Sequence, residues 1–127
     1  MAMSKLLYEE ETYAIRGAVF EVYREMCSGF LESVYQECLE RELIQRGIQF
    51  SRQQPIALSY KEEPLEQTFA ADLVCYGAII IELKAVKELA AVHRAQVLNY
   101  LKCTGYRLGL LVNFGNFPKA EVERIVL

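Results

Sequence analysis

Two carboxylates and a lysine lie close together in the segment 72–84, whose other residues are mostly apolar. Gly77 lies midway along this segment, which predicts a tight β-hairpin of two buried strands. In the hairpin Asp72 stands opposite Glu82, with Cβ atoms about 5 Å apart, and Lys84 projects from the same face as Glu82. Like charges at that distance in an apolar sheet are unfavourable unless a cation lies between them. The three groups are therefore typical of a metal-dependent hydrolytic site.

This interpretation depends on the register of the hairpin. A three-residue turn over residues 76–78 pairs Cys75 with Ile79 and brings the two acids together. A two-residue turn would move Glu82 to the other face of the sheet. The spacing also leaves open a plain salt bridge, at the strand ends, between Lys84 and one of the two acids.

The length and composition predict one ordinary globular domain. The 127 residues are enough for a single core, and we expect one domain over residues 1–127. Hydrophobic residues make up 53% of the chain and charged residues 24%, as in water-soluble folded proteins. Residues 1–11 contain no apolar run typical of a signal peptide, and no apolar stretch is long enough to cross a bilayer. We therefore expect no membrane partner.

The cysteines and the net charge restrict the compartment and the function. The four cysteines lack C-x-x-C spacing, so we expect them to be reduced and buried in a cytoplasmic protein, without zinc or disulfide roles. The net charge of −3 argues against a nonspecific coat on nucleic acid. An enzyme on nucleic acid needs only a local basic rim, and the second half of the chain offers Lys84, Lys87, Arg94, Lys102 and Arg107.

Hydrophobic spacing predicts the order of the elements. Helices are expected over residues 9–26, 31–45 and 89–103, each followed by a glycine. Strands are expected over residues 48–50, 56–60, 67–74, 79–84 and 106–113, with a polar turn at 61–64. Residues 120–127 fit either a short strand or a helix. The predicted class is α/β (α+β), a mixed sheet flanked by helices in the order αα-ββββ-α-β.

Several motifs occur in an order that resembles a known family. Residues 29–35, Gly-Phe-Leu-Glu-Ser-Val-Tyr, fit the pattern G-x-x-E-x-x-Y. The segment 72–84 supplies a lone aspartate and then the triplet Glu-Leu-Lys, and residues 96–100 match Q-x-x-x-Y. Over residues 15–126 the chain resembles the GxxExxY proteins, small members of the PD-(D/E)XK nuclease superfamily. Ala71 stands where the superfamily's name has proline, a position that varies among relatives.

The resemblance implies a restriction-endonuclease-like core and a nuclease site for Mg²⁺ or Mn²⁺. On the matching positions, Asp72, Glu82 and the backbone carbonyl of Leu83 would bind the metal. Glu32 would enter from the second helix as a further acid, directly or through water. Lys84 would either deprotonate the attacking water or stabilise the developing charge.

Three polar residues of the third predicted helix share one face, because His93, Gln96 and Tyr100 follow each other at intervals of three and four. The resemblance implies that Gln96 braces the catalytic site and that Tyr100, with His93, lies toward the substrate. Each residue also has a plainer interpretation: Gln96 as a solvated residue, His93 as a helix cap and Tyr100 as packing on the sheet. Glu32 suits a helix N-terminus in any protein, and Tyr35 is expected in the core.

The sequence thus supports one leading function and leaves alternatives open. The leading hypothesis is a Mg²⁺-dependent nuclease that hydrolyses phosphodiesters of DNA, or alternatively RNA, with metal-activated water. The second is a catalytically silent module of the same fold that binds nucleic acid or a protein partner, which the small size and acidic charge favour. A metal-free structural protein ranks third. By analogy with small nucleases, a homodimer is a possible assembly.

Overall fold

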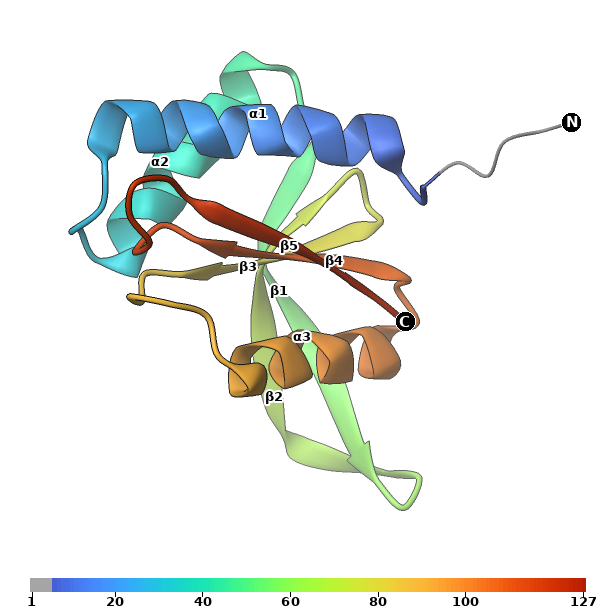
Figure 1. The fold of residues 1–127 in the computed structure, drawn as a ribbon. Helices are drawn as coiled ribbons and strands as arrows, with labels where there is room; N and C mark the ends of the chain where they lie inside the picture. Colours follow the sequence, from blue (N-terminus) through green and yellow to red (C-terminus); the bar gives the residue numbers. More distant parts are fainter. Residues whose placement is uncertain (1–5) are drawn as a thin grey trace, which may run out of the picture.

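The computed structural model describes residues 6–127. Within this range the chain forms three helices and one five-stranded sheet (Figure 1). The elements follow the chain in the order α1 (Glu9–Met26), α2 (Glu32–Gln45), β1 (Phe50–Tyr60), β2 (Glu63–Cys75), β3 (Ile79–Lys84), α3 (Ala91–Thr104), β4 (Leu108–Asn113) and β5 (Glu121–Val126).

The sheet is mixed, and its strands lie in chain order from β1 to β5. Neighbouring strands are antiparallel except β3 and β4, which are parallel because α3 carries the chain back between them. Helices α1 and α2 cover one face of the sheet and α3 covers the other (Figure 1). Strands β3 and β4 are consequently buried almost throughout, as expected for a parallel pair with helices on both faces.

The predicted class, a mixed sheet flanked by helices, is confirmed, but the detailed order differs by one strand on each side of α3. Residues 48–50 and 56–60 do not form two strands, because β1 runs unbroken through the polar residues between them. These residues are mostly exposed on an edge strand, so they lack the apolar alternation that signals a strand. Residues 121–126 form the strand β5 beside β4, which settles the open choice at the C-terminus.

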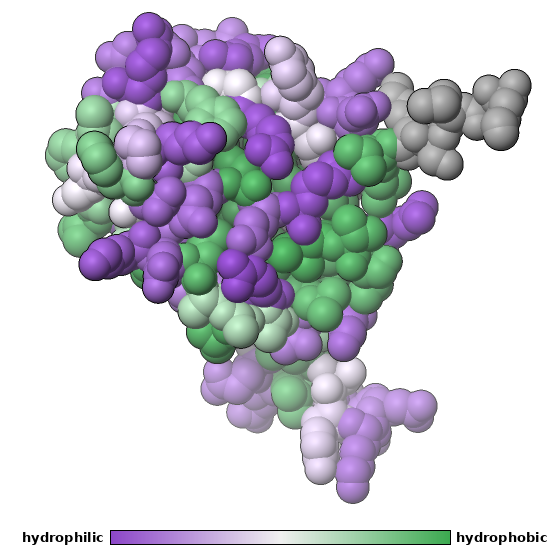
Figure 2. Space-filling view, viewed as in Figure 1, coloured by the Kyte–Doolittle hydropathy of each residue, from purple (hydrophilic) through white to green (hydrophobic). Residues whose placement is uncertain are grey.

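The outer half of the β1–β2 hairpin projects beyond the rest of the sheet as an arm (Figure 1). Its tip is a two-residue turn, Lys61–Glu62, in which both residues have positive φ, and Tyr60 pairs with Glu63. Residues 63–68 of β2 are all exposed, and the arm carries a mostly hydrophilic surface (Figure 2). The arm therefore contributes little to the core.

The larger hydrophobic core lies between the sheet and the α1–α2 pair. Tyr35 is fully buried there, as predicted, and its ring stacks on Phe114 with centroids 4.6 Å apart. Smaller clusters lie under α3, around Val97 and Leu101. No helix within the described part of the chain has both the length and the apolar character to cross a membrane.

The expectation of buried cysteines is confirmed only for Cys75. Cys27 and Cys103 are exposed, and Cys38 is half-buried. Cys27 follows α1 directly, and Cys103 lies in the last turn of α3, where neighbouring elements do not cover the helix end. The prediction was wrong for these cysteines because a small, weakly polar side chain is tolerated both in the core and at an exposed helix end.

A buried amide ties the chain together just beyond the ends of the two central strands. Asn113 is fully buried, and its side-chain oxygen accepts hydrogen bonds from the backbone N–H groups of Val86 and Gly115, both at 3.0 Å. Its side-chain nitrogen donates to Glu121 at 3.0 Å. Phe114 N–H donates to the carbonyl of Lys84 at 2.9 Å. The loop after β3 is therefore fixed against the end of β4.

We expect Gly115→Ala to lower the free energy of unfolding by about 2 kcal/mol or more, because overpacking against fixed backbone is costly. An added Cβ would lie 2.3 Å from the Val86 carbonyl oxygen and 2.5 Å from its nitrogen. Gly105→Ala is the matched control, because Gly105 has φ 80° and open space around it. Alanine there is destabilised only by the left-handed backbone conformation, which costs about 1 kcal/mol. Urea unfolding measures both. Equal losses would show that the close approach does not require glycine at position 115.

Candidate active site

The β2–β3 hairpin has the register that the sequence predicts. Cys75 pairs with Ile79, and the turn between them has three residues, closed by a 3.0 Å hydrogen bond from Ala78 N–H to the Cys75 carbonyl. Tyr76 and Gly77 have positive φ values of 58° and 65°. The glycine takes this conformation without cost, which helps to select this turn over a shorter one.

The register brings the two acids together through the backbone of the opposite strand. Asp72 N–H donates to a carboxyl oxygen of Glu82 at 3.2 Å, and Leu83 N–H donates to a carboxyl oxygen of Asp72 at 2.8 Å. Each carboxyl group is thus held by an amide of the neighbouring strand. The pair sits on the sheet face that α3 covers, beside the only parallel strand junction of the described chain.

Burial and mutual repulsion make the ionised forms of these acids unfavourable. Glu82 is only 6% exposed, and its burial, followed by the negative charge of Asp72, raises the pKa of its carboxyl to about 8. Burial likewise raises the pKa of Asp72, although the hydrogen bond from Leu83 and the charge of Lys84 oppose the change. The protein therefore holds two acids where one of them favours the neutral form at physiological pH.

Glu32 approaches the pair from the first turn of α2. The residue is exposed, yet partial burial of its carboxyl and then the charge of Asp72 raise its pKa, with Lys84 acting in the opposite direction. Within residues 6–127, no cluster of three or more His, Cys, Asp or Glu side chains is close enough to hold a metal ion together. The charge of Glu32 therefore interacts with the sheet acids, but the three carboxyl groups do not form one cluster.

Lys84 and Gln96 meet across the gap between β3 and α3. The Lys84 ammonium donates to the side-chain oxygen of Gln96 at 3.3 Å. Lys84 is half-buried at the end of β3, two residues beyond Glu82 and on the same face. The third helix thus positions the amine beside the acids, as the predicted helix face requires.

Tyr100 and His93 have different relations to the acids. Burial, followed by the charges of Glu82 and Asp72, raises the pKa of the Tyr100 hydroxyl to about 12, which places its ring near both acids. The ring also stacks on Phe69 of β2, with centroids 3.5 Å apart. His93 instead caps α3, since Ala90 N–H donates to its Nδ1 at 3.0 Å. His93 therefore makes the helix-cap contact of its plainer interpretation, and the Tyr100 ring packs on the sheet through Phe69. A place for Tyr100 beside the substrate stays a prediction.

One site residue has no place in the sequence motifs. Gln36 lies one turn after Glu32 on α2, and its side-chain nitrogen donates to the backbone carbonyl of Asp72 at 3.2 Å. The spacing of four residues puts Gln36 and Glu32 on the same side of the helix, and that spacing is the signal that could have identified it. The bond links α2 directly to the strand that carries the first acid.

The donors present suit a hard divalent cation. Carboxylate and carbonyl oxygens are the ligands that Mg²⁺ prefers, and this ion retains several waters, so it needs few protein ligands. The carboxyl groups of Asp72 and Glu82 lie side by side on the sheet, and Leu83, which follows Glu82, contacts Asp72 through its backbone N–H. A cation there would relieve the repulsion between the two buried acids. The residues therefore fit the metal that the sequence predicts.

A mixed sheet with this acid–acid–lysine arrangement, flanked by helices on both faces, defines a restriction-endonuclease-like domain. A family model described as the PD-(D/E)XK nuclease superfamily matches residues 9–125, so the chain belongs to that superfamily. Nucleases of this superfamily generally use divalent metals.

One solved structure supports the fold independently. The crystal structure of SSO0001 is similar to the chain with a TM-score of 0.58 and 17% sequence identity. The match covers 94% of this chain and 59% of that chain, so the present chain spans less than two thirds of its length. Comparison with curated proteins gave no significant match.

We expect Glu82→Gln to stabilise the metal-free protein at pH 8 and to change little at pH 4. The Glu82 carboxyl has a pKa of about 8 in the folded protein and about 4.3 in an unfolded chain. Between these values the folded state binds more protons, so the stability that the buried neutral acid provides is lost as pH rises. The melting temperature at pH 8 should increase by roughly 4 °C for each kcal/mol relieved.

Thermal unfolding in chelator, from pH 4 to pH 8, measures this difference. Glu63→Gln makes the same chemical change at an exposed position of β2 and serves as the control. A gap between wild type and Glu82→Gln that stays constant across the pH range would contradict the assignment of a buried, mainly neutral carboxyl.

Proposed function

We propose that this protein is a divalent-metal-dependent nuclease that hydrolyses phosphodiester bonds of DNA, with RNA as the alternative substrate. The observation that carries the proposal is the meeting of Asp72, Glu82 and Lys84 on one face of the sheet in a member of a nuclease superfamily. A bound Mg²⁺ or Mn²⁺ would supply a water of lowered pKa and would act as a Lewis acid on the phosphoryl group.

In this proposal the sheet acids hold the metal. Asp72 and Glu82 contribute carboxylate oxygens and Leu83 its carbonyl oxygen, while Glu32 acts through a metal-bound water. The hydrogen bonds from Leu83 N–H to Asp72 and from Asp72 N–H to Glu82 orient both carboxyl groups before metal binds. Such preorganisation lowers the cost of assembling the site, because fewer groups must be fixed on binding.

Lys84 would act on the attacking water or on the phosphoryl oxygens. As a base it would accept the proton of the water, and as a cation it would stabilise the negative charge that develops on the phosphoryl oxygens. Gln96 restricts the position of the Lys84 nitrogen in either role, because its side-chain oxygen accepts a hydrogen bond from that nitrogen at 3.3 Å. Gln96 is therefore a positioning residue in the proposal, and Lys84 is the catalytic one.

Tyr100 and His93 complete the proposed substrate side of the site. Tyr100 lies near the acids with its ring stacked on Phe69, where it can contact a nucleotide bound at the metal. His93 lies one turn before Gln96 on the same helix face, although its recorded contact is the cap of α3. We also propose that the chain belongs to the GxxExxY branch, on the strength of Gly29, Glu32 and Tyr35. A homodimer stays a prediction.

We expect Mn²⁺ and Mg²⁺ to bind wild type, and Asp72→Ala to abolish that binding, because the substitution removes one of the two adjacent carboxyl groups that would hold the metal. Isothermal titration calorimetry of each metal into both proteins measures this. Circular dichroism of Asp72→Ala shows whether the fold is retained. Absence of binding by wild type would contradict the proposed metal site and the chemistry that depends on it.

We expect Glu82→Ala and Lys84→Ala each to lower the rate of metal-dependent cleavage by about a hundredfold or more, the range for losing one acid–base or charge-stabilising group. The assay should offer single-stranded, duplex and branched DNA together with RNA. Lys61→Ala and Glu63→Ala make the matching changes at exposed positions of the hairpin arm and should cleave like wild type. Metal binding without cleavage of any substrate would favour the silent-module alternative.

A further inference from the structure

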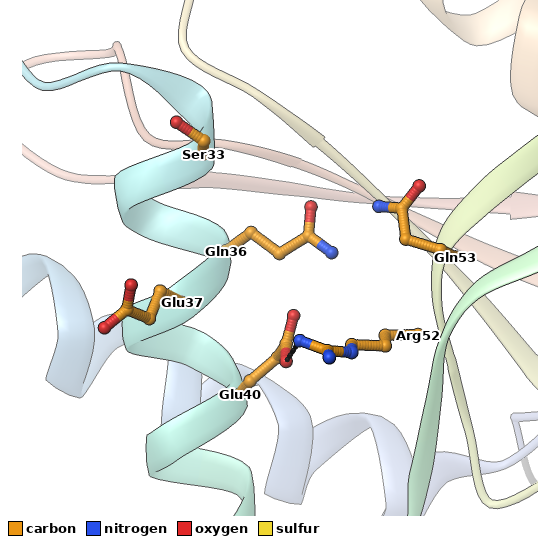
Figure 3. A pocket seen from close by; sticks show the side chains of 6 residues that line it. All are labelled: Ser33, Gln36, Glu37, Glu40, Arg52 and Gln53. Carbon is orange, nitrogen blue, oxygen red and sulfur yellow. Dashed lines mark hydrogen bonds and ion pairs between the residues drawn. The ribbon is translucent and has the colours of Figure 1, made fainter.

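A polar pocket of about 530 Å³ opens between α2 and β1, next to the proposed active site. Its volume lies in the range of roughly 300–1,000 Å³ that is typical of small-ligand sites. The lining residues are all polar: Ser33, Gln36, Glu37, Glu40, Arg52 and Gln53 (Figure 3). Gln36 belongs to both places, since its side-chain nitrogen also donates to the Asp72 carbonyl. The pocket and the acids thus share a wall.

The pairing of the edge strand is interrupted at this wall. Arg52 pairs with Leu73 and Gln54 with Ala71, but Gln53 and Asp72, which stand between these pairs, do not pair. Gln53 has φ 51°, a left-handed conformation that is uncommon for glutamine inside a strand. Such outliers concentrate at functional sites, where they redirect a side chain or a peptide group.

The two glutamine side chains face each other across the pocket. Figure 3 shows the Gln36 amide extending from α2 toward β1 and the Gln53 amide extending back toward α2. The Gln53 amide offers donors and an acceptor, and the Gln36 amide keeps one N–H and its oxygen beside the bond to Asp72. A donor together with an acceptor is the combination with which glutamine recognises the edge of a nucleobase. Gln36 of α2 and Gln53 of the interrupted strand therefore place two side-chain amides close to Asp72.

The charges of the pocket favour a neutral ligand over a phosphate. Arg52, the one cation in the lining, is paired with Glu40 at 3.5 Å. Glu37 is paired with Arg41 at 3.1 Å. The one arginine of the lining is thus already paired, so the lining offers no unpaired cation to a phosphate group, whereas the side-chain oxygens of Gln36 and Gln53 can accept hydrogen bonds from the amino groups of a base.

We infer that this pocket receives an unpaired nucleobase of the substrate, recognised by the Gln36 and Gln53 amides, while the neighbouring phosphodiester lies at Asp72 and Glu82. The inference rests on the proposed nuclease function and specifies its substrate as single-stranded or locally unpaired nucleic acid. A base inside a duplex cannot enter a side pocket without leaving the stack. Gln36 and Gln53 are then specificity-determining residues of the site.

Nuclear magnetic resonance of ¹⁵N-labelled full-length protein tests the inference without any cleavage. Each of the four nucleosides is titrated into the protein, with inorganic phosphate as the comparison ligand. We expect at least one nucleoside to shift the side-chain amide signals of Gln36 and Gln53, and phosphate to leave them unchanged. Absence of any nucleoside shift at these amides, or equal shifts with phosphate, would overturn the inference.

Variants of Gln53 separate base recognition from folding. Gln53→Gly removes the amide and tolerates φ 51°, and we expect about tenfold weaker nucleoside binding. Gln53→Asn keeps an amide in a residue that also accepts this conformation, so it should retain most of the affinity. Gln67→Ala, at an exposed position of β2 in the arm, is the matched control and should bind like wild type.

The same variants distinguish the failure of this inference from the failure of the proposed function. Metal-dependent cleavage with unchanged nucleoside affinity in Gln53→Gly would support the proposed nuclease function and contradict the base pocket. Nucleoside binding that depends on Gln53, in a protein that cleaves none of the substrates, would support the base pocket and contradict the proposed nuclease function.

Discussion

The burial of two like-charged carboxyl groups side by side is the constraint around which this structure is organised. Asp72 and Glu82 stand on adjacent strands, and Glu82 is almost wholly removed from solvent. Such a pair is unfavourable in a low-dielectric interior unless protons, hydrogen bonds or a cation compensate. The fold supplies the hydrogen bonds through the backbone amides of Asp72 and Leu83. It leaves the remaining compensation to a proton or a metal.

The strands that carry this pair are fixed by hydrophobic packing that does not involve the acids themselves. Strand β3 is buried between α3 and the α1–α2 layer, so the backbone that carries Glu82 and Lys84 is fixed by packing on both faces. The loop that follows is fixed through the buried amide of Asn113. Residues that would act in catalysis therefore stand on rigid strands and helices, where positions are better defined than on free loops.

The parts of this arrangement that were predictable are those with a local or periodic signal. The three long helices followed from apolar spacing, and the hairpin register followed from the position of Gly77 between two apolar runs. An aspartate inside a buried strand is itself informative, because this residue is depleted in strands, and Asp72 is the only aspartate of the chain. The spacing in the hairpin predicts that the two acids and Lys84 meet, whereas Gln96 was predicted only through the resemblance to the nuclease family, and its hydrogen bond to Lys84 is seen only in the structure.

What could not be predicted depends on contacts between distant segments. The middle of β1 is polar and exposed, so only its pairing with β2 makes it a strand. The hydrogen bond from Gln36 to the Asp72 carbonyl and the left-handed backbone of Gln53 arise where α2, β1 and β2 meet. No residue-by-residue pattern encodes that junction, and neither the exposure of Cys27 nor the pocket beside Asp72 has a sequence signal.

The balance of charge in the site connects folding with the proposed chemistry. Without a cation, the raised pKa of Glu82 means that ionising the acid opposes folding as pH rises through about 8. A metal that binds only the folded state would remove this penalty and add its own binding free energy, in proportion to the logarithm of its concentration over Kd. Under the proposed function, the feature that weakens the metal-free fold is therefore the same feature that selects for the metal.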